Sequence, residues 1–260
     1  MRLYCREFDG PADRTLLVIH GGPDWDHSYL VDPLDQLAGA HRLLFPDLRG
    51  CGRSPAEEPL TPDAMVADLA ELIGEGPVDV LGFSYGGLIA QRLAIQHPAL
   101  VRRLIVASSS VLPVPDDAFE GWEEYERRRA LYPSVWDAPG LEGVALTRAE
   151  AFACAPCEVW RPSSLPRYLE ILEKVRFTAS YLGVYRAGKF PSARYPDGPE
   201  RLEATGIPVL LLQGRQDMTF PAFLAERVPF AESVILENAG HMAHVDQRTD
   251  WLRAVQKFLE

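Results

Sequence analysis

The stretch Gly82-Phe83-Ser84-Tyr85-Gly86-Gly87 constrains the fold more than any other part of the chain. A short apolar run, residues 78–81, precedes it, and a helix-like run, residues 88–95, follows it. The pattern predicts a strand, a sharp turn and a helix, with the Gly-x-Ser-x-Gly of a nucleophile elbow on the turn. The serine of such a turn has a strained backbone, so only glycine fits two residues to either side. Its hydroxyl is exposed at the positive end of a helix, so we predict that Ser84 is a nucleophile.

Size and composition fit one large α/β domain, because such folds run to about 250 residues as a single unit. The chain has 260 residues, of which 47% are hydrophobic and 24% charged. It has no apolar run near the ~18 residues that a membrane span needs, and residues 1–7 have no apolar signal segment, so we expect a cytoplasmic protein. The net charge of −11 argues against nucleic acid and anionic membranes as partners.

The pair Cys154-Ala155-Pro156-Cys157 raises the question of a zinc or redox site. A zinc site needs a second pair of cysteines or histidines at ligand spacing, and a thioredoxin-type pair follows a strand. Neither context is visible, so we interpret the pair as two thiols in a helical segment and expect neither a metal nor a cofactor.

Short apolar runs alternate with helical patterns at both ends of the chain. The runs that predict strands, besides residues 78–81, are residues 2–8, 15–20, 42–45, 103–107, 207–212 and 233–236. A helix is expected to begin at Pro62, after Thr61 as N-cap, and to stop at Gly74; others are expected at residues 221–228 and at the C-terminal end. Alternating strands and helices imply a mostly parallel sheet with helices on both faces.

Between residues 111 and 200 the pattern changes to helices broken by prolines, with many aromatic residues. We therefore predict a helical cap, residues 111–200, inserted after the strand near residue 107. The core domain would consist of residues 1–110 and 201–260.

Reacting groups in open α/β sheets gather at the carboxyl ends of the strands. Asp217 follows the strand at 207–212 and His241 follows the strand at 233–236, in the chain order Ser, Asp, His that a nucleophile elbow predicts. His241 would take the Ser84 proton, and Asp217 would orient the imidazole. Two alternatives remain: Asp217 also fits a turn before a helix, and His244 follows the same strand, although Gly240 favours His241.

An oxyanion hole needs one backbone N–H after the nucleophile and one from the loop after the 15–20 strand. Tyr85 provides the first. In His20-Gly21-Gly22-Pro23 the second is expected from Gly22, since Pro23 has no N–H, and the Gly22–Pro23 bond is a candidate for a cis peptide.

With these residues in place, the whole chain resembles the α/β-hydrolase fold superfamily. It is most similar to the prolyl aminopeptidase (proline iminopeptidase) branch in three stretches: His20-Gly21-Gly22-Pro23, Asp47-Leu48-Arg49-Gly50-Cys51-Gly52-Arg53-Ser54, and Gly214-Arg215-Gln216-Asp217 followed by Pro221. It departs from the branch where Asp24-Trp25-Asp26 replaces a glycine-containing loop and where Phe83 and Tyr85 replace Gly and Trp in the elbow. Gly-Phe-Ser-Tyr-Gly-Gly also suits esterases, lactonases and C–C bond hydrolases.

The branch resemblance implies a cap glutamate that binds the amino group of the substrate. In the branch it usually follows a Trp-x-x-Trp, and here the counterpart is Glu158 after the cysteine pair. Glu123 and Glu124 are set aside because arginines four residues on would pair with them. Asp24 and Asp26 remain alternatives. Trp25 and Trp160, with other cap aromatics, would form an apolar pocket or belong to the core.

The sequence thus predicts a serine hydrolase that acts through an acyl-enzyme on a small molecule or short peptide. The first hypothesis is an aminopeptidase of the proline iminopeptidase type, and the second is a carboxylesterase or lactonase of small apolar esters. A non-catalytic ligand receptor on the same fold is a remote alternative. An aspartate-nucleophile hydrolase is excluded because the elbow carries Ser84. The oligomeric state is not predicted.

Overall fold

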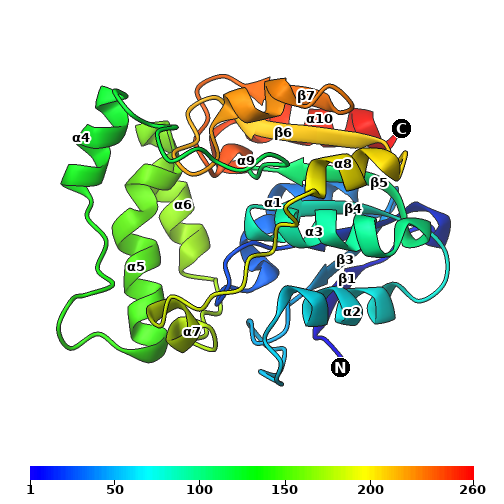
Figure 1. Ribbon diagram of the computed structural model, residues 1–260, viewed down its shortest axis with the longest axis horizontal. Coiled ribbons are helices and arrows are strands. Elements are labelled where there is room, and N and C mark those ends of the chain that lie inside the picture. The colour runs from blue at the N-terminus through cyan, green and yellow to red at the C-terminus, as the bar shows by residue number, and fades with distance from the viewer.

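The computed structural model describes residues 1–260 and has one seven-stranded sheet at its centre (Figure 1). The strand order is β1-β3-β2-β4-β5-β6-β7; β1 pairs antiparallel with β3, and every other pair is parallel. The strands are β1 (Cys5–Phe8), β2 (Thr15–Ile19), β3 (Arg42–Pro46), β4 (Val78–Phe83), β5 (Val101–Ala107), β6 (Val209–Gly214) and β7 (Glu232–Leu236). This confirms the predicted mostly parallel sheet and places a strand in every run that predicted one.

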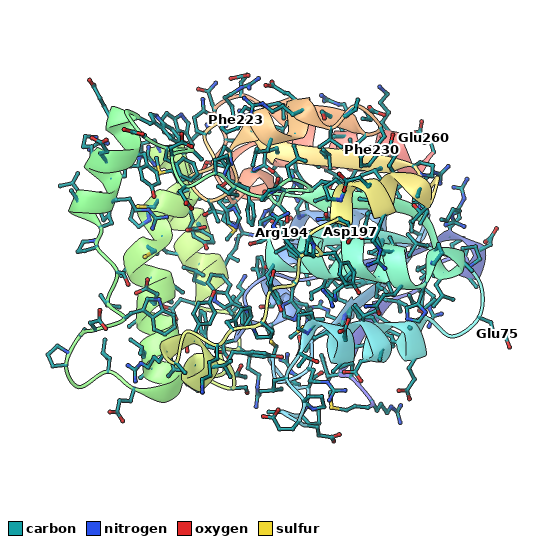
Figure 2. The ribbon with its side chains drawn as sticks, in the orientation of Figure 1. Glu75, Arg194, Asp197, Phe223, Phe230 and Glu260 are labelled. Atoms are coloured by element: carbon teal, nitrogen blue, oxygen red, sulfur yellow. The ribbon has the colours of Figure 1, made fainter.

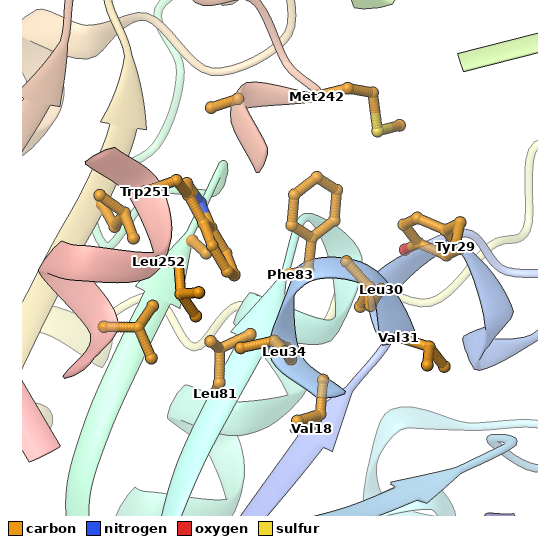
Figure 3. Close-up of a cluster of buried hydrophobic side chains, with 14 of the residues drawn as sticks. Val18, Tyr29, Leu30, Val31, Leu34, Leu81, Phe83, Met242, Trp251 and Leu252 are labelled. Carbon is orange, nitrogen blue, oxygen red and sulfur yellow. The ribbon is translucent and has the colours of Figure 1, made fainter. Parts of the chain in front are cut away.

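Helices cover both faces of the sheet, because the side chains of its buried strands alternate between two apolar layers. Leu16 and Val18 of β2 lie in the layer with α1 (Val31–Leu34) and α10 (Arg248–Leu259). Leu17 and Ile19 lie in the opposite layer. That layer contains α2 (Pro62–Ile73), α3 (Tyr85–Gln96) and α8 (Gly198–Ala204). Figure 3 shows part of the first layer, where Trp251 and Leu252 of α10 face Leu81 and Phe83 of β4.

Local signals set the limits of α2 as the sequence predicted. Oγ1 of Thr61 accepts a hydrogen bond from the N–H of Ala64 at 3.3 Å, and Pro62 is the first helical residue. Gly74, with a φ of 69°, ends the helix in a conformation that glycine adopts without strain. The 221–228 helix was less accurately predicted: residues Ala222–Arg227 form a 3-10 helix rather than an α-helix.

Four helices between β5 and β6 lie together at one end of the sheet, on the left in Figure 1. They are α4 (Glu123–Leu131), α5 (Gly143–Glu158), α6 (Leu165–Leu172) and α7 (Leu182–Arg186), which we call the cap helices. Tyr168 and Leu172 of α6 and Ala151 and Ala155 of α5 belong to the same apolar layer as α10, so α5 and α6 pack directly on the sheet layer. The division into a core and a cap domain at residues 110 and 200 stays a prediction.

Arg194, labelled in Figure 2, lies on the segment that returns from the cap helices to the sheet. It links this segment to the one that leaves the sheet after β5. Its Nη1 donates hydrogen bonds to the carbonyl oxygens of Ser110 (2.8 Å) and Val111 (3.0 Å), where the chain leaves the sheet. The segment that leaves the sheet and the segment that returns to it are therefore held together.

None of the helices combines the length and apolar character required for crossing a bilayer.

Candidate active site

Ser84 occupies a strained turn between β4 and α3. Its φ of 54° and ψ of −121° lie outside the regions that side chains favour. A Cβ on Gly82 would lie 2.6 Å from the Cβ of Ala90, and a Cβ on Gly86 would overlap the carbonyl oxygens of Ile19 and His20. Only glycine fits at both positions, as the elbow pattern predicts.

The side chains of Ser84, His241 and Asp217 form one hydrogen-bonded chain. Oγ of Ser84 lies 3.1 Å from Nε2 of His241, and Nδ1 of His241 lies 2.9 Å from Oδ2 of Asp217. Each residue follows the carboxyl end of a parallel strand, β4, β7 and β6 respectively. The alternative base, His244, is directed elsewhere, since its Nε2 lies 3.1 Å from the carbonyl oxygen of Tyr29. The geometry therefore supports a base at His241, within reach of the hydroxyl proton.

Asp217 is almost fully buried and receives several hydrogen bonds besides that from His241. The backbone N–H groups of Thr219 and Phe220 donate to Oδ1 at 2.7 and 3.0 Å, and Nε2 of Gln213 donates to Oδ2 at 2.6 Å. Buried charges are tolerated when such donors surround them. The carboxylate is thereby held in one orientation toward the imidazole.

The imidazole of His241 is 5% exposed and lies between the rings of Phe83 and Phe220. Burial lowers the pKa of His241, but the carboxylates of Asp217 and, to a smaller extent, Glu158 outweigh it and raise that pKa to about 9. The positive charge of Arg129 acts in the opposite direction. Asp217 and Glu158 therefore favour the imidazolium that proton transfer from a serine would create.

The loop after β2 is fixed by hydrogen bonds on both sides of Gly21. The N–H of Gly21 donates to the hydroxyl of Tyr29 at 2.7 Å, and its carbonyl oxygen lies 2.7 Å from Nδ1 of His20. Nε2 of His20 accepts from the N–H of Leu48 at 2.9 Å, so Nδ1 carries the ring proton, and burial lowers the pKa of His20. Gly22 follows with a φ of 109° and a cis bond to Pro23.

Gly22 and Ser84 line the same cavity, and Tyr85 is the first residue of α3. The first four N–H groups of an α-helix have no partner within the helix, so the Tyr85 N–H is free to bind a ligand oxygen. This arrangement fits the predicted oxyanion hole, whose role stays a prediction.

A cavity of about 280 Å³ lies between the sheet and the cap helices and contains Ser84 and His241. Its lining is partly aromatic and partly charged. The lining residues are Gly22, Pro23, Asp24, Trp25, Tyr29, Phe83, Ser84, Arg129, Trp136, Thr147, Glu150, Ala151, Cys154, Glu158, Tyr185, Thr219, His241 and Met242. Trp25, an expected pocket residue, packs edge-on against Tyr29 and Phe177 with ring centroids 5.4 Å apart in both pairs.

The cavity carboxylates differ in whether they already accept hydrogen bonds from other groups of the protein. Oδ1 of Asp24 accepts from Oγ1 of Thr178 at 2.9 Å and from the N–H of Tyr181 at 3.2 Å. Oε2 of Glu150 accepts from the N–H of Val135 at 2.6 Å and from the hydroxyl of Ser134 at 3.0 Å. Both groups therefore hold neighbouring backbone in place.

Asp26, the other aspartate that the sequence analysis kept as an alternative, is not part of the cavity lining. It binds Ser28 and Arg53 instead. It is therefore not placed to bind a substrate amine.

Glu158 is the cavity carboxylate with no hydrogen-bond donor from the protein. It is the last residue of α5, and burial raises its pKa, whereas the nearby charges of His241 and Arg129 lower it. A carboxylate without a protein donor, close to the imidazole of His241, is available to bind a ligand cation.

The structure does not place Trp160 in the cavity, so a substrate-binding role for it does not fit. α5 ends at Glu158, and the extended backbone at Val159 (φ −105°, ψ 139°) changes the direction of the chain. The Trp160 ring packs instead against the guanidinium of Arg128, whose Cζ lies 4.6 Å from the ring centroid. Cys154 and Cys157 are free thiols within α5, as expected for a helical segment, and burial raises the pKa of Cys154 to about 12.

Two residues that the sequence analysis did not select contribute to the site. Arg129 lines the cavity, and Asp246 accepts hydrogen bonds from the N–H groups of Gly240, Trp160 and Arg161 at 2.9, 2.7 and 3.1 Å. Asp246 thus joins the His241 loop to the end of α5. Three successive arginines on a helix point about 100° apart, so the sequence implies that they do not all share the same partners, but it does not show which of them faces the cavity.

Comparison with known proteins gives relatives that span this chain. The sequence profile of the alpha/beta hydrolase family matches residues 16–255. A proline iminopeptidase of Saccharolobus solfataricus is 26% identical, covering 96% of this chain and 86% of that protein. A 2-hydroxymuconate semialdehyde hydrolase of a Pseudomonas species is 28% identical, covering 96% and 88%. A thermophilic esterase of Thermogutta terrifontis, solved with malate bound, has a TM-score of 0.74 at 25% identity, covering 99% and 92%.

Proposed function

This chain belongs to the alpha/beta hydrolase family and is a hydrolase, and we propose that Ser84 is its nucleophile, His241 its general base and Asp217 the residue that orients the imidazole. The support is the hydrogen-bonded chain of these three side chains in a cavity large enough for a small substrate. The strained turn at Ser84 adds to it, because strain of this kind is retained where function needs it.

The proposed reaction has two halves. Nε2 of His241 takes the proton of the Ser84 hydroxyl while Oγ attacks the substrate carbonyl carbon, and the N–H groups of Gly22 and Tyr85 stabilise the resulting oxyanion. The imidazolium returns the proton to the leaving group as the scissile bond breaks, which leaves an acyl-enzyme. Water then attacks the acyl-enzyme by the same route and releases the acid and free Ser84.

For the substrate class we propose short peptides with a free N-terminal residue, as in a proline iminopeptidase. The observation that carries this is Glu158, a carboxylate that lines the Ser84 cavity and has no donor from the protein. A hydrogen bond between a carboxylate and an ammonium group contributes about 1.5–3 kcal/mol, enough to select substrates with a free amine. The proline iminopeptidase among the relatives is consistent with this choice.

The second candidate is a carboxylesterase or lactonase of small apolar esters. It is favoured by the aromatic lining of the cavity, including Trp25, Tyr29 and Phe83, and by the esterase among the solved structures. In this case Glu158 would not contribute to substrate selection.

One substrate comparison separates the two candidates. We expect the native enzyme to hydrolyse proline p-nitroanilide, and Glu158→Gln to lower kcat/KM for it by about 10–100-fold while affecting p-nitrophenyl acetate much less. Glu150→Gln is the matched control, because Glu150 lines the same cavity but is bound by Ser134 and Val135. Rapid ester hydrolysis with no turnover of the anilide would instead support the esterase.

A further inference from the structure

Arg129 is the one arginine in the lining of the Ser84 cavity. It is the last of three successive arginines on α4, and the side chains of the other two already have partners within the protein. Arg127 pairs with Glu124 at 2.7 Å, on an exposed part of the helix. Arg128 pairs with the same Glu124 and donates to the carbonyl oxygens of Pro156, Val159 and Trp160.

Arg129 differs from both neighbours because no protein group accepts a hydrogen bond from its guanidinium. Its Nε is buried without a partner, and it forms no ion pair within 4.0 Å. The ring of Tyr125 lies near the guanidinium, with its centroid 5.5 Å from Cζ. Arg129 as a whole is half-buried, and its Nε–H is a buried donor with no protein acceptor. Leaving such a donor unpaired costs about 1–3 kcal/mol, so a ligand oxygen that accepts from it would be stabilised.

The nearest acidic groups do not provide that partner. Glu150 already accepts hydrogen bonds from Ser134 and Val135. Glu158 is close enough for its charge to act on Arg129, and both act on His241, yet Glu158 and Arg129 are not in contact. Two opposite charges therefore face one cavity with a gap between them, a pattern that suits a ligand carrying both charges.

We propose that Arg129 forms a carboxylate subsite in the Ser84 cavity, and that the preferred substrates carry a free carboxylate in addition to the scissile carbonyl group. The planar guanidinium binds a carboxylate through two parallel hydrogen bonds. This inference rests on the proposed function where it concerns peptides: Glu158 binds the ammonium group and Arg129 the carboxylate of a short unblocked peptide.

Matched substrate pairs that differ in one charge test the subsite. The peptide pair is prolyl-glycine and prolyl-glycinamide, and the ester pair is monomethyl glutarate and dimethyl glutarate. The readout is the ratio of kcat/KM for the charged member to kcat/KM for the neutral member. We expect this ratio to fall about 10–100-fold in Arg129→Gln, to be partly restored in Arg129→Lys, and to stay unchanged in Arg127→Gln.

A ratio that is the same in the native protein and Arg129→Gln would overturn the subsite. If only the ester pair is hydrolysed, the peptidase proposal fails while the ester ratio still tests Arg129. Should Arg129→Gln not fold, inhibition of the native protein gives the answer: glutarate is expected to compete with substrate at least tenfold more strongly than glutaramide. Equal inhibition by the two compounds would contradict the proposal.

Discussion

Asp217 and His241 follow two neighbouring parallel strands, β6 and β7, and Oδ2 of Asp217 lies 2.9 Å from Nδ1 of His241. The pairing fixes the tautomer of the ring, because an N–H at Nδ1 leaves Nε2 free to accept the proton of Ser84. The same carboxylate is held by the backbone N–H groups of Thr219 and Phe220. The position of the imidazole thus depends on the loop after β6 as much as on its own loop.

Replacing Asp217 by Asn should keep the shape of the site and remove the charge. The amide can donate to Nδ1, which favours the tautomer with its proton on Nε2, the wrong one for a base. We expect kcat to fall by about 10⁴, with a far-UV circular dichroism spectrum like that of the native protein. A loss of less than tenfold in a folded Asp217→Asn protein would show that Asp217 does not orient the base.

The activity should depend on pH through His241, which accepts a proton only in its neutral form. Because its pKa is raised to about 9, we expect kcat/KM to increase as the pH rises toward that value. The negative charge of Glu158 contributes to the raised pKa of His241, so Glu158→Gln should move the midpoint of the kcat/KM profile to lower pH. Arg129→Gln removes a charge that lowers the pKa and should move the midpoint to higher pH. Shifts in the same direction for both variants would contradict this electrostatic account.

The elbow should not tolerate a side chain at Gly86. A Cβ there overlaps the carbonyl oxygens of Ile19 and His20, so Gly86→Ala must displace β2 or α3. We expect the free energy of unfolding, measured with urea, to fall by about 1–3 kcal/mol, together with loss of activity. The matched control is Gly183→Ala in α7, where a Cβ would meet nothing within 4 Å and stability should increase by up to about 1 kcal/mol. Equal stability of the two variants would argue against the crowding.

The strands and the positions of Ser84, Asp217 and His241 were predictable because local patterns set them. Apolar runs mark the strands of a parallel sheet, and strand order brings their carboxyl ends to one edge. The strained conformation of Ser84 could be expected from its flanking glycines alone.

The charged part of the cavity was not predictable, because it depends on contacts between residues far apart in the chain. Asp24 is bound by Thr178, 154 residues away, so it is not free for substrate, and nothing near Asp24 in the sequence indicates this. Trp160 is directed away because α5 ends two residues earlier. Arg129 could be distinguished from Arg128 only once the carbonyl oxygens at residues 156–160 were in place.

The most direct test of the account is covalent labelling by a fluorophosphonate probe, which reacts with a serine only when a nearby base activates it. We expect rapid, stoichiometric labelling of the native protein, with the modified peptide containing Ser84, and no labelling of Ser84→Ala. Labelling of folded Ser84→Ala at the native rate, or no reaction of the native protein at all, would contradict the central claim that His241 makes the Ser84 hydroxyl a nucleophile; the second result would favour a ligand receptor.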